Sequence, residues 1–181
     1  MKLLGISGTI IGSKTRLAVE KALEFAKEYD PNIDIELLDL KEYDLQFCDG
    51  RAIEDYSEDT KKVIEMISNA DVFLVGTPIF HGSIPGVLKN LFDLIPAEVF
   101  QHKVFGFIAT AGNHHHYLMI ENQLRPIAGY FNAYVSPYSA FIHSEDFKDN
   151  KIANNEILNQ LSHLANDVIK LHKLNKEEIN I

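Results

Sequence analysis

The feature that most constrains this fold is a regular alternation between short apolar runs and segments of helical periodicity. The apolar runs have the length of strands, and in the segments between them apolar residues recur every three or four positions. The expected strands are 2–6, 33–37, 71–76, 103–109 and 133–142, and the expected helices are about 17–29, 57–69, 83–95, 117–130 and 154–173. Strands and helices that alternate in this order predict a parallel sheet covered by helices on both faces.

A five-stranded sheet of this class favours the flavodoxin-like strand order 2-1-3-4-5, a doubly wound α/β fold. The 181 residues contain no repeat and no linker long enough to set off a second domain, so residues 1–181 are interpreted as one domain. In the favoured order the loops 7–15, 77–83 and 110–116 all follow the carboxyl ends of strands. We therefore expect these loops to meet at one rim of the sheet, where such folds bind ligands.

Individual residues refine these boundaries. Ser83 is placed to cap the helix expected at 83–95. Pro85 falls in the first turn of that helix, where a proline is tolerated because the missing N–H group would have no partner within the helix. Pro126 lies inside an expected helix and should kink it. Pro137 marks its strand as an edge strand or a bulged one. Residues 41–57 show weak periodicity and are expected to form a long loop.

Composition narrows the partners and the location. The net charge of −9 argues against a nucleic acid or an anionic membrane surface as partner, because both repel an acidic chain. The sequence has no apolar run of membrane-spanning length and no leader with a cleavage site. Its one cysteine, Cys48, has no partner for an internal disulfide and no neighbour that would make it reactive. These observations favour a cytoplasmic protein.

The first loop combines hydroxyl groups, glycines and positive charge at the start of a helix. Hydroxyl donors, cations and the free N–H groups of a helix start together suit a phosphate. The alternative is a polar strand-to-helix turn with a good cap, and composition alone leaves both open. The candidate phosphate-binding residues are Ser7, Thr9, Ser13, Lys14, Thr15 and Arg16.

Other nucleotide-binding motifs fit this loop poorly. The run 12–15 lacks the adjacent Gly-Lys of a triphosphate-binding loop, and no acidic residue ends the third strand to hold Mg²⁺. Gly8 and Gly12 do not supply the glycine pattern of a dinucleotide fold, so Asp39 is interpreted as an ordinary strand-end cap. A phospho-acceptor receiver domain would need acidic residues where this chain has hydroxyls.

The second loop, 77–83, offers backbone donors and acceptors beside an aromatic ring. A planar heterocycle needs a flat apolar surface and hydrogen bonds at its edge, and this loop could supply both. Phe80 could equally be a core aromatic. His81 could be a solvated loop residue or an acid–base group, although the sequence shows no carboxylate partner for it.

The third loop contains three adjacent histidines, residues 114–116. Adjacent loop residues rarely converge on one metal ion, and no cysteine or carboxylate lies nearby in the sequence, so we expect no metal site. Ala111, Gly112 and Asn113 are better placed to approach a bound ring, since glycine permits close backbone contact. The histidines are expected to line the entrance.

The segment 76–93, GTPIFHGSIPGVLKNLFD, carries a family resemblance. It is similar to the Pro-Gly-Ser block that leads into a Leu-Lys-Asn helix in the NADPH-dependent FMN reductase family. The runs 7–9 and 13–16 resemble the phosphate loop of that family, and 124–126 resembles its segment before the fifth strand. Over residues 2–142 the chain resembles the branch that includes small azoreductases and quinone or chromate reductases.

The resemblance implies a flavodoxin-like fold with noncovalent FMN, and NADPH or NADH as co-substrate. It implies that the first-loop residues named above face the FMN phosphate. Members are typically homodimers or homotetramers, with the helix after the second loop at the interface. The residues that it implies around the isoalloxazine ring are Thr77, Pro78, Ile79, Phe80, His81 and Gly82 in one loop and Ala111, Gly112 and Asn113 in the other.

Two departures from the family alter the expected pocket. Many members have Arg soon after the first Ser-Gly, where positions 10–11 are both isoleucine here, so Lys14 or Arg16 must supply that charge. Many members have Glu-Tyr where positions 79–80 are Ile-Phe. The loss of the phenol removes a hydrogen-bonding group and makes the pocket more apolar.

The sequence therefore predicts an FMN-dependent oxidoreductase in which NAD(P)H reduces the bound flavin, which carries the chemistry. Electrons then pass, in ping-pong order, to a flavin, quinone, azo compound or similar small acceptor. No single side chain need act as a catalytic acid. One alternative is a flavodoxin-like electron carrier that binds FMN but reacts slowly with NAD(P)H. A binding module without flavin is the other.

Overall fold

The computed structural model describes residues 1–179 and contains a five-stranded parallel sheet in the order β2-β1-β3-β4-β5. The predicted fold class and strand order are confirmed. The one-domain prediction extends to residue 181, so residues 180–181 of it lie outside the described range. The strands are β1 (Lys2–Ser7), β2 (Asp34–Asp39), β3 (Val72–Pro78), β4 (Val104–Ala111) and β5 (Tyr134–His143).

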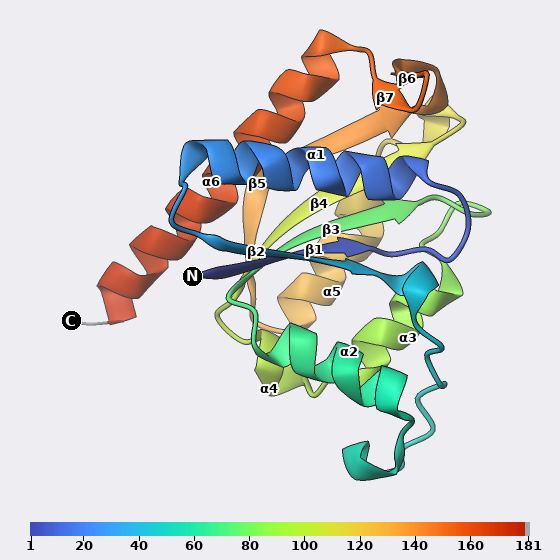
Figure 1. Ribbon diagram of the computed structural model, residues 1–181, viewed down its shortest axis with the longest axis vertical. Helices are drawn as coiled ribbons and strands as arrows, with labels where there is room; N and C mark the ends of the chain where they lie inside the picture. Colours follow the sequence, from blue (N-terminus) through green and yellow to red (C-terminus); the bar gives the residue numbers. More distant parts are fainter. Residues whose placement is uncertain (180–181) are drawn as a thin grey trace.

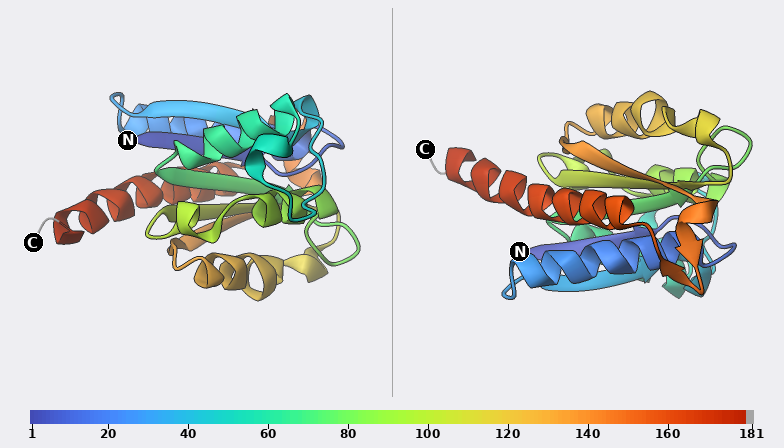
Figure 2. Two further views of the ribbon diagram at one scale, coloured as in Figure 1. Left: turned by 90° about the horizontal axis from the view of Figure 1, so that it is seen from below. Right: turned by 90° about the horizontal axis from the view of Figure 1, so that it is seen from above.

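Helices cover both faces of the sheet (Figure 1). On one face lie α1 (Lys14–Tyr29) and α6 (Asn155–Ile179), which cross the sheet side by side in Figure 2. Each face has its own buried apolar cluster, as expected for a sheet that is covered on both sides. The face opposite α1 and α6 carries α2 (Glu58–Ser68), α3 (Gly86–Leu94), α4 (Ala97–Phe100) and α5 (Arg125–Tyr130).

No helix in the described range is both long enough and apolar enough to cross a bilayer.

The close approach of α1 to the sheet depends on Gly76 in β3. A Cβ atom at Gly76 would lie 2.3 Å from Cγ2 of Val19 and 3.1 Å from Cγ2 of Thr15, both in α1. Because glycine has no side chain, the first turn of α1 can rest on the carboxyl ends of the central strands. This contact brings Thr15 to β4, where its Oγ1 lies 2.8 Å from Oγ1 of Thr110.

The segment before β5 differs from the single kinked helix predicted over 117–130. It consists of a 3-10 turn, η3 (His114–His116), a π-helical turn, η4 (Ile120–Leu124), and then α5. Pro126 lies in the first turn of α5. A proline lacks an N–H group and clashes with the carbonyl four residues before it, and the wider π-helical turn accommodates both effects.

Helix α3 begins at Gly86, and its N-cap is Pro85, so the prediction that Ser83 caps this helix is wrong. The hydroxyl of Ser83 instead donates to Oε1 of Gln123 at 2.8 Å. Ser83 also exchanges two backbone hydrogen bonds with Phe80 across a tight turn. Ser83 therefore ties the second loop to the π-helical turn.

β5 is an edge strand with a bulge, as Pro137 predicts. Its register with β4 shifts between Phe105 and Phe107. Beyond β5 the chain forms elements that the sequence did not suggest, and α6 begins only after them. They are a 3-10 turn, η5 (Ser144–Asp146), and a small hairpin of β6 (Phe147–Lys148) and β7 (Lys151–Ile152). The long loop at 41–57 contains the end of one short 3-10 turn, η1 (Leu40–Glu42), and the whole of another, η2 (Ile53–Asp55).

Candidate functional site

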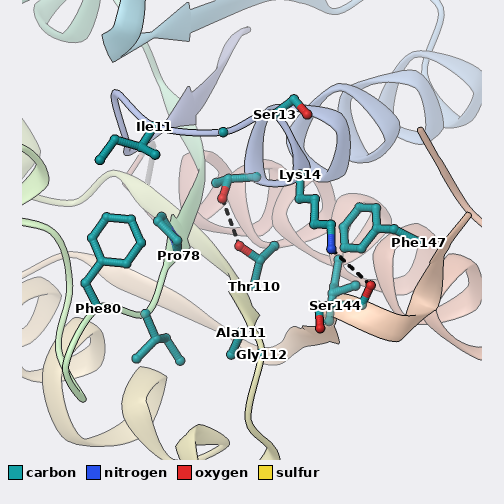
Figure 3. A pocket seen from close by; sticks show the side chains of 14 residues that line it. Ile11, Ser13, Lys14, Pro78, Phe80, Thr110, Ala111, Gly112, Ser144 and Phe147 are labelled. Carbon is teal, nitrogen blue, oxygen red and sulfur yellow. Dashed lines mark hydrogen bonds between the residues drawn. The ribbon is translucent and has the colours of Figure 1, made fainter. Parts of the chain in front are cut away.

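The three predicted loops meet at the carboxyl edge of the sheet and enclose a cavity of about 390 Å³ (Figure 3). The segment after β5 closes the remaining side with Ser144 and Phe147. None of the fourteen lining residues, all in the described part of the chain, carries a carboxylate, and Lys14 supplies a positive charge. In a chain with 26 Asp and Glu against 17 Lys and Arg, such a lining favours an anionic ligand.

The polar end of the cavity lies at the start of α1. Ser13 is the exposed N-cap residue of α1, and within the described residues its side chain makes no capping hydrogen bond. The first-turn N–H groups and the positive end of the helix dipole therefore remain available to an anion. The side chain of Lys14 reaches across the cavity, where its Nζ donates to the carbonyl of Ser144 at 3.1 Å (Figure 3).

A buried hydroxyl pair holds this end in place. Thr15 in α1 and Thr110 in β4 are 3% and 6% exposed, and their hydroxyl groups are 2.8 Å apart. A buried hydrogen bond contributes about 1 kcal/mol net, but a partner left unsatisfied would cost about 1–3 kcal/mol. The pair therefore fixes the position of α1 relative to β4 and leaves one hydroxyl proton directed away from the shared bond.

The opposite end of the cavity is apolar and lies on the second loop. Pro78 and Phe80 face the cavity across from Lys14 (Figure 3), and Phe80 is 38% exposed. The loop turns back through His81 and Gly82, whose φ angles are 51° and 78°. Positive φ at both central residues defines a type I′ turn, which glycine adopts readily and histidine adopts at some cost. Gln123 holds the turn by accepting from Ser83.

Arg16 is engaged elsewhere. Its guanidinium contacts Glu20 at 2.8 Å, Glu42 at 2.6 Å and Asp39 at 3.0 Å. Hydrogen bonds to Glu20, Glu42 and Asp39 raise the pKa of Arg16 above its ordinary value. Asp39 also accepts from the backbone N–H of Lys41, which is the strand-end cap that the sequence suggests. Among the described residues that line the cavity, Lys14 rather than Arg16 supplies the positive charge.

The other predicted residues divide between the lining and its support. Ser7 and Thr77 are buried in their strands, and the hydroxyl of Thr9 bonds to the backbone of Ile11. The side chain of Asn113 accepts from His115 and so starts the 3-10 turn. Eight predicted residues line the cavity: Ser13, Lys14, Thr15, Pro78, Ile79, Phe80, Ala111 and Gly112. Seven do not: Ser7, Thr9, Arg16, Thr77, His81, Gly82 and Asn113.

Several lining residues were missed by sequence reasoning. Thr110 is the first residue of the predicted third loop, 110–116, so its position next to a strand end was a usable signal. Ser144 and Phe147 lie beyond the last predicted strand and belong to no motif. Cys48 is not one of the lining residues. It lies in the long loop, where its thiol donates to the carbonyl of Asp93.

Known proteins resemble this chain in sequence and in fold. A family model described as NADPH-dependent FMN reductase matches residues 1–148. A protein named NAD(P)H-dependent FAD/FMN reductase, from Geobacillus thermodenitrificans, is 52% identical over 173 residues, which is 95% of this chain and 94% of that protein. A protein named FMN-dependent NADPH-azoreductase, from Staphylococcus saprophyticus, is 32% identical over 117 residues, which is 62% of this chain and 61% of that protein.

Among solved structures, an oxidoreductase from Corynebacterium diphtheriae superimposes with a TM-score of 0.77 at 22% identity, covering 94% of this chain and 95% of that one. At this identity the likeness concerns the fold. The family model and the 52% identical relative together settle the family. The chain therefore belongs to the NADPH-dependent FMN reductase family, in agreement with the oxidoreductase activity, FMN cofactor and nicotinamide co-substrate predicted from the sequence.

Proposed function

We propose that FMN binds in this cavity with its phosphate at the start of α1 and its ring against the second loop, and that NAD(P)H and a small acceptor use the open mouth in turn. The observation that carries the proposal is the polarity of the cavity. Its lining has Lys14 and hydroxyl groups at one end, apolar side chains at the other, and no carboxylate among the described lining residues.

The residues at the α1 end fit a phosphate monoester. Ser13, Lys14 and the first-turn N–H groups supply hydrogen-bond donors, and a bond to a charged group contributes about 1.5–3 kcal/mol. Lys14 would exchange the neutral carbonyl of Ser144 for a dianion, which is the better partner for an ammonium group. Thr15 can direct its hydroxyl at the same ligand without leaving Thr110 unpaired.

The residues at the other end fit a flat ring. Pro78, Ile79 and Phe80 present an apolar surface. On the opposite wall the backbone of Gly112 is accessible, because a Cβ there would have Ser144 Oγ, at 3.9 Å, as its nearest described neighbour. A peptide group without a side chain can approach the edge of a ring and form hydrogen bonds with its nitrogen and oxygen atoms.

Bound FMN supplies the hydride acceptance and electron donation. The chain would position the ring and leave the cavity open to solvent on one side. The hydride donor and the electron acceptor could then bind at that opening one after the other. Ile11 and Phe80 line the cavity and are 65% and 38% exposed, which favours a flat apolar acceptor such as a quinone, an azo compound or a second flavin. The relative named as an azoreductase supports this acceptor class.

A visible absorption spectrum tests the proposal. The chain is loaded with FMN, desalted, kept anaerobic and mixed with NADPH or NADH. Retained flavin that bleaches within seconds is expected for a reductase, and parallel double-reciprocal plots against an acceptor are expected for ping-pong order. Flavin that is retained but stays oxidised would instead indicate an electron carrier.

We further propose a homodimer or homotetramer that buries the α3 face. A groove between α3 and α5 supports this proposal, because Phe92 and Ile127 line it beside Tyr130, which is 76% exposed. Light scattering coupled to gel filtration measures the mass. We also propose a cytoplasmic location, supported by the single exposed thiol of Cys48.

A further inference from the structure

Three potential metal ligands from two segments meet beside the cavity. One ring nitrogen each of His114 and His143 and one carboxylate oxygen of Glu145 all lie within 4.8 Å of one another. The two imidazole rings are stacked, with centroids 3.9 Å apart and planes 16° apart. Nδ1 of His143 lies 3.5 Å from Oε2 of Glu145. His115 and His116, although adjacent to His114 in the sequence, are not part of this cluster.

The fold fixes one ligand and leaves two adjustable. His143 ends β5 and is 8% exposed, and its backbone N–H donates to Oδ2 of Asp146 at 2.9 Å. Asp146 is itself held by the side chain of Asn154 at 2.7 Å. His114 follows the Asn113 cap and is exposed, and the side chain of Glu145 is 84% exposed. Such an arrangement has a rigid anchor and two side chains that can rotate toward an ion.

We propose that His114, His143 and Glu145 bind one divalent transition-metal ion of the Zn²⁺ class. Two histidines and a carboxylate with a further position open is a common ligand set for such ions. Ligands bound about 2.0–2.1 Å from a tetrahedral Zn²⁺ are about 3.3 Å apart, close to the separation between Nδ1 of His143 and Oε2 of Glu145. Because an imidazole nitrogen coordinates a metal in the plane of its ring, the ring of His114 must rotate out of its stacked arrangement with His143 to bind the same ion, and its exposed side chain allows that rotation.

The charged groups around the cluster sum to a net negative charge, which suits a cation. Glu145 and Asp146 contribute two negative charges, and Lys14 contributes one positive charge through its contact with the Ser144 carbonyl. In the metal-free geometry Nδ1 of His143 accepts a hydrogen bond from the backbone N–H of Glu145, at a long 3.3 Å. A metal ion on Nδ1 would replace this weak bond with a coordinate bond.

The site would join two walls of the cavity. His114 lies two residues beyond Gly112 and His143 lies next to Ser144, and both Gly112 and Ser144 line the cavity. A bound ion would therefore clamp the loop after β4 to the turn after β5. This inference is independent of the flavin proposal, since none of the three ligands belongs to the cavity lining.

The test uses the untagged full-length chain, freed of metal with a chelator and titrated with Zn²⁺ in a calorimeter. We expect one Zn²⁺ per chain. His114→Ala and Glu145→Gln should each weaken binding at least about tenfold, because each removes a ligand. His116→Ala, which removes a neighbouring histidine from outside the cluster, should change the affinity less than about twofold.

Thermal unfolding of the metal-free variants separates loss of a ligand from loss of structure, and the two variants alter different segments. Absence of saturable binding to the unaltered chain would overturn the proposal. So would equal losses for His114→Ala and His116→Ala, which would indicate diffuse binding to the histidine run, or an unchanged affinity for Glu145→Gln.

Discussion

The two ends of the cavity are built in different ways. The α1 end rests on a 16-residue helix, and the buried Thr15–Thr110 pair fixes that helix against β4. The opposite end is a turn of four residues, held by the backbone bonds between Phe80 and Ser83 and by Gln123. One end is therefore part of the core, whereas the other is attached to it.

This difference suggests that the α1 end determines how tightly a ligand binds, and that the turn determines which shapes of ligand can be admitted. Hydrogen-bond donors on a packed helix are already in position before a ligand binds, so binding loses little conformational entropy of the protein. A short exposed turn such as 80–83 can shift to admit acceptors of different shape. We therefore expect changes at the α1 end to alter stability and phosphate recognition, and changes at the turn to alter ring binding with little effect on the fold.

The largest expected effect is at Gly76. In Gly76→Ala the new Cβ would lie 2.3 Å from Cγ2 of Val19, so either the Val19 side chain or α1 itself must shift. Overpacking of this kind costs about 1–3 kcal/mol, and we expect a loss near the upper end in urea unfolding, together with weaker FMN binding. Gly129→Ala is the matched control, because a Cβ there meets no described atom within 4 Å. Equal stability of the two variants would contradict the packing argument.

The next effect concerns the charge at the α1 end. Lys14→Gln should raise the Kd for FMN by about tenfold to a hundredfold, the equivalent of about 1.5–3 kcal/mol for a charged hydrogen bond. Fluorescence titration measures it. Riboflavin, which lacks the phosphate, should bind both forms equally.

Lys21→Gln removes a cation from the same helix that is paired with Glu24 and lies outside the cavity lining, and it should leave FMN affinity unchanged. If Lys14→Gln weakens riboflavin and FMN to the same extent, the phosphate is not at this end.

The sequence predicts the central architecture because periodicity reports burial directly. β3 and β4 are buried along nearly their whole length, and their apolar runs are continuous. The meeting of the three loops follows from strand order alone. Five of the eight predicted residues that reach the lining lie at a strand end or within two positions of one, and the other three, Ser13, Lys14 and Thr15, lie where the helix after the first strand begins.

The features of the site that could not be predicted depend on contacts between segments that are far apart in the sequence. Nothing near Arg16 in the sequence shows that Asp39 and Glu42 will take its charge. Ser144 and Phe147 line the cavity because the chain folds back after β5, and no local pattern signals that return. The same applies to His143, which lies beside His114 although 29 positions (143 − 114) separate them.

A smaller effect is expected at the apolar end. Phe80→Ala should weaken FMN and riboflavin alike, by about fivefold, because a side chain that is 38% exposed loses about 1 kcal/mol of ring contact when truncated. Phe47→Ala is the control, since Phe47 is 79% exposed and outside the lining. A larger effect on FMN than on riboflavin would show that Phe80 acts on the phosphate end, and would remove the distinction drawn between the two ends.

The smallest effect is at His81, at the tip of the turn, where φ is 51°. His81→Ala and His81→Gly both remove the imidazole, but only glycine adopts this backbone geometry without cost. Alanine should therefore be less stable than glycine by about 1 kcal/mol in thermal unfolding. Turnover with NADPH should be equal in the two variants and close to that of the unaltered chain if His81 only forms the turn. A similar fall in turnover for both, with FMN affinity intact, would instead assign the imidazole an acid–base role and make the turn part of the chemistry.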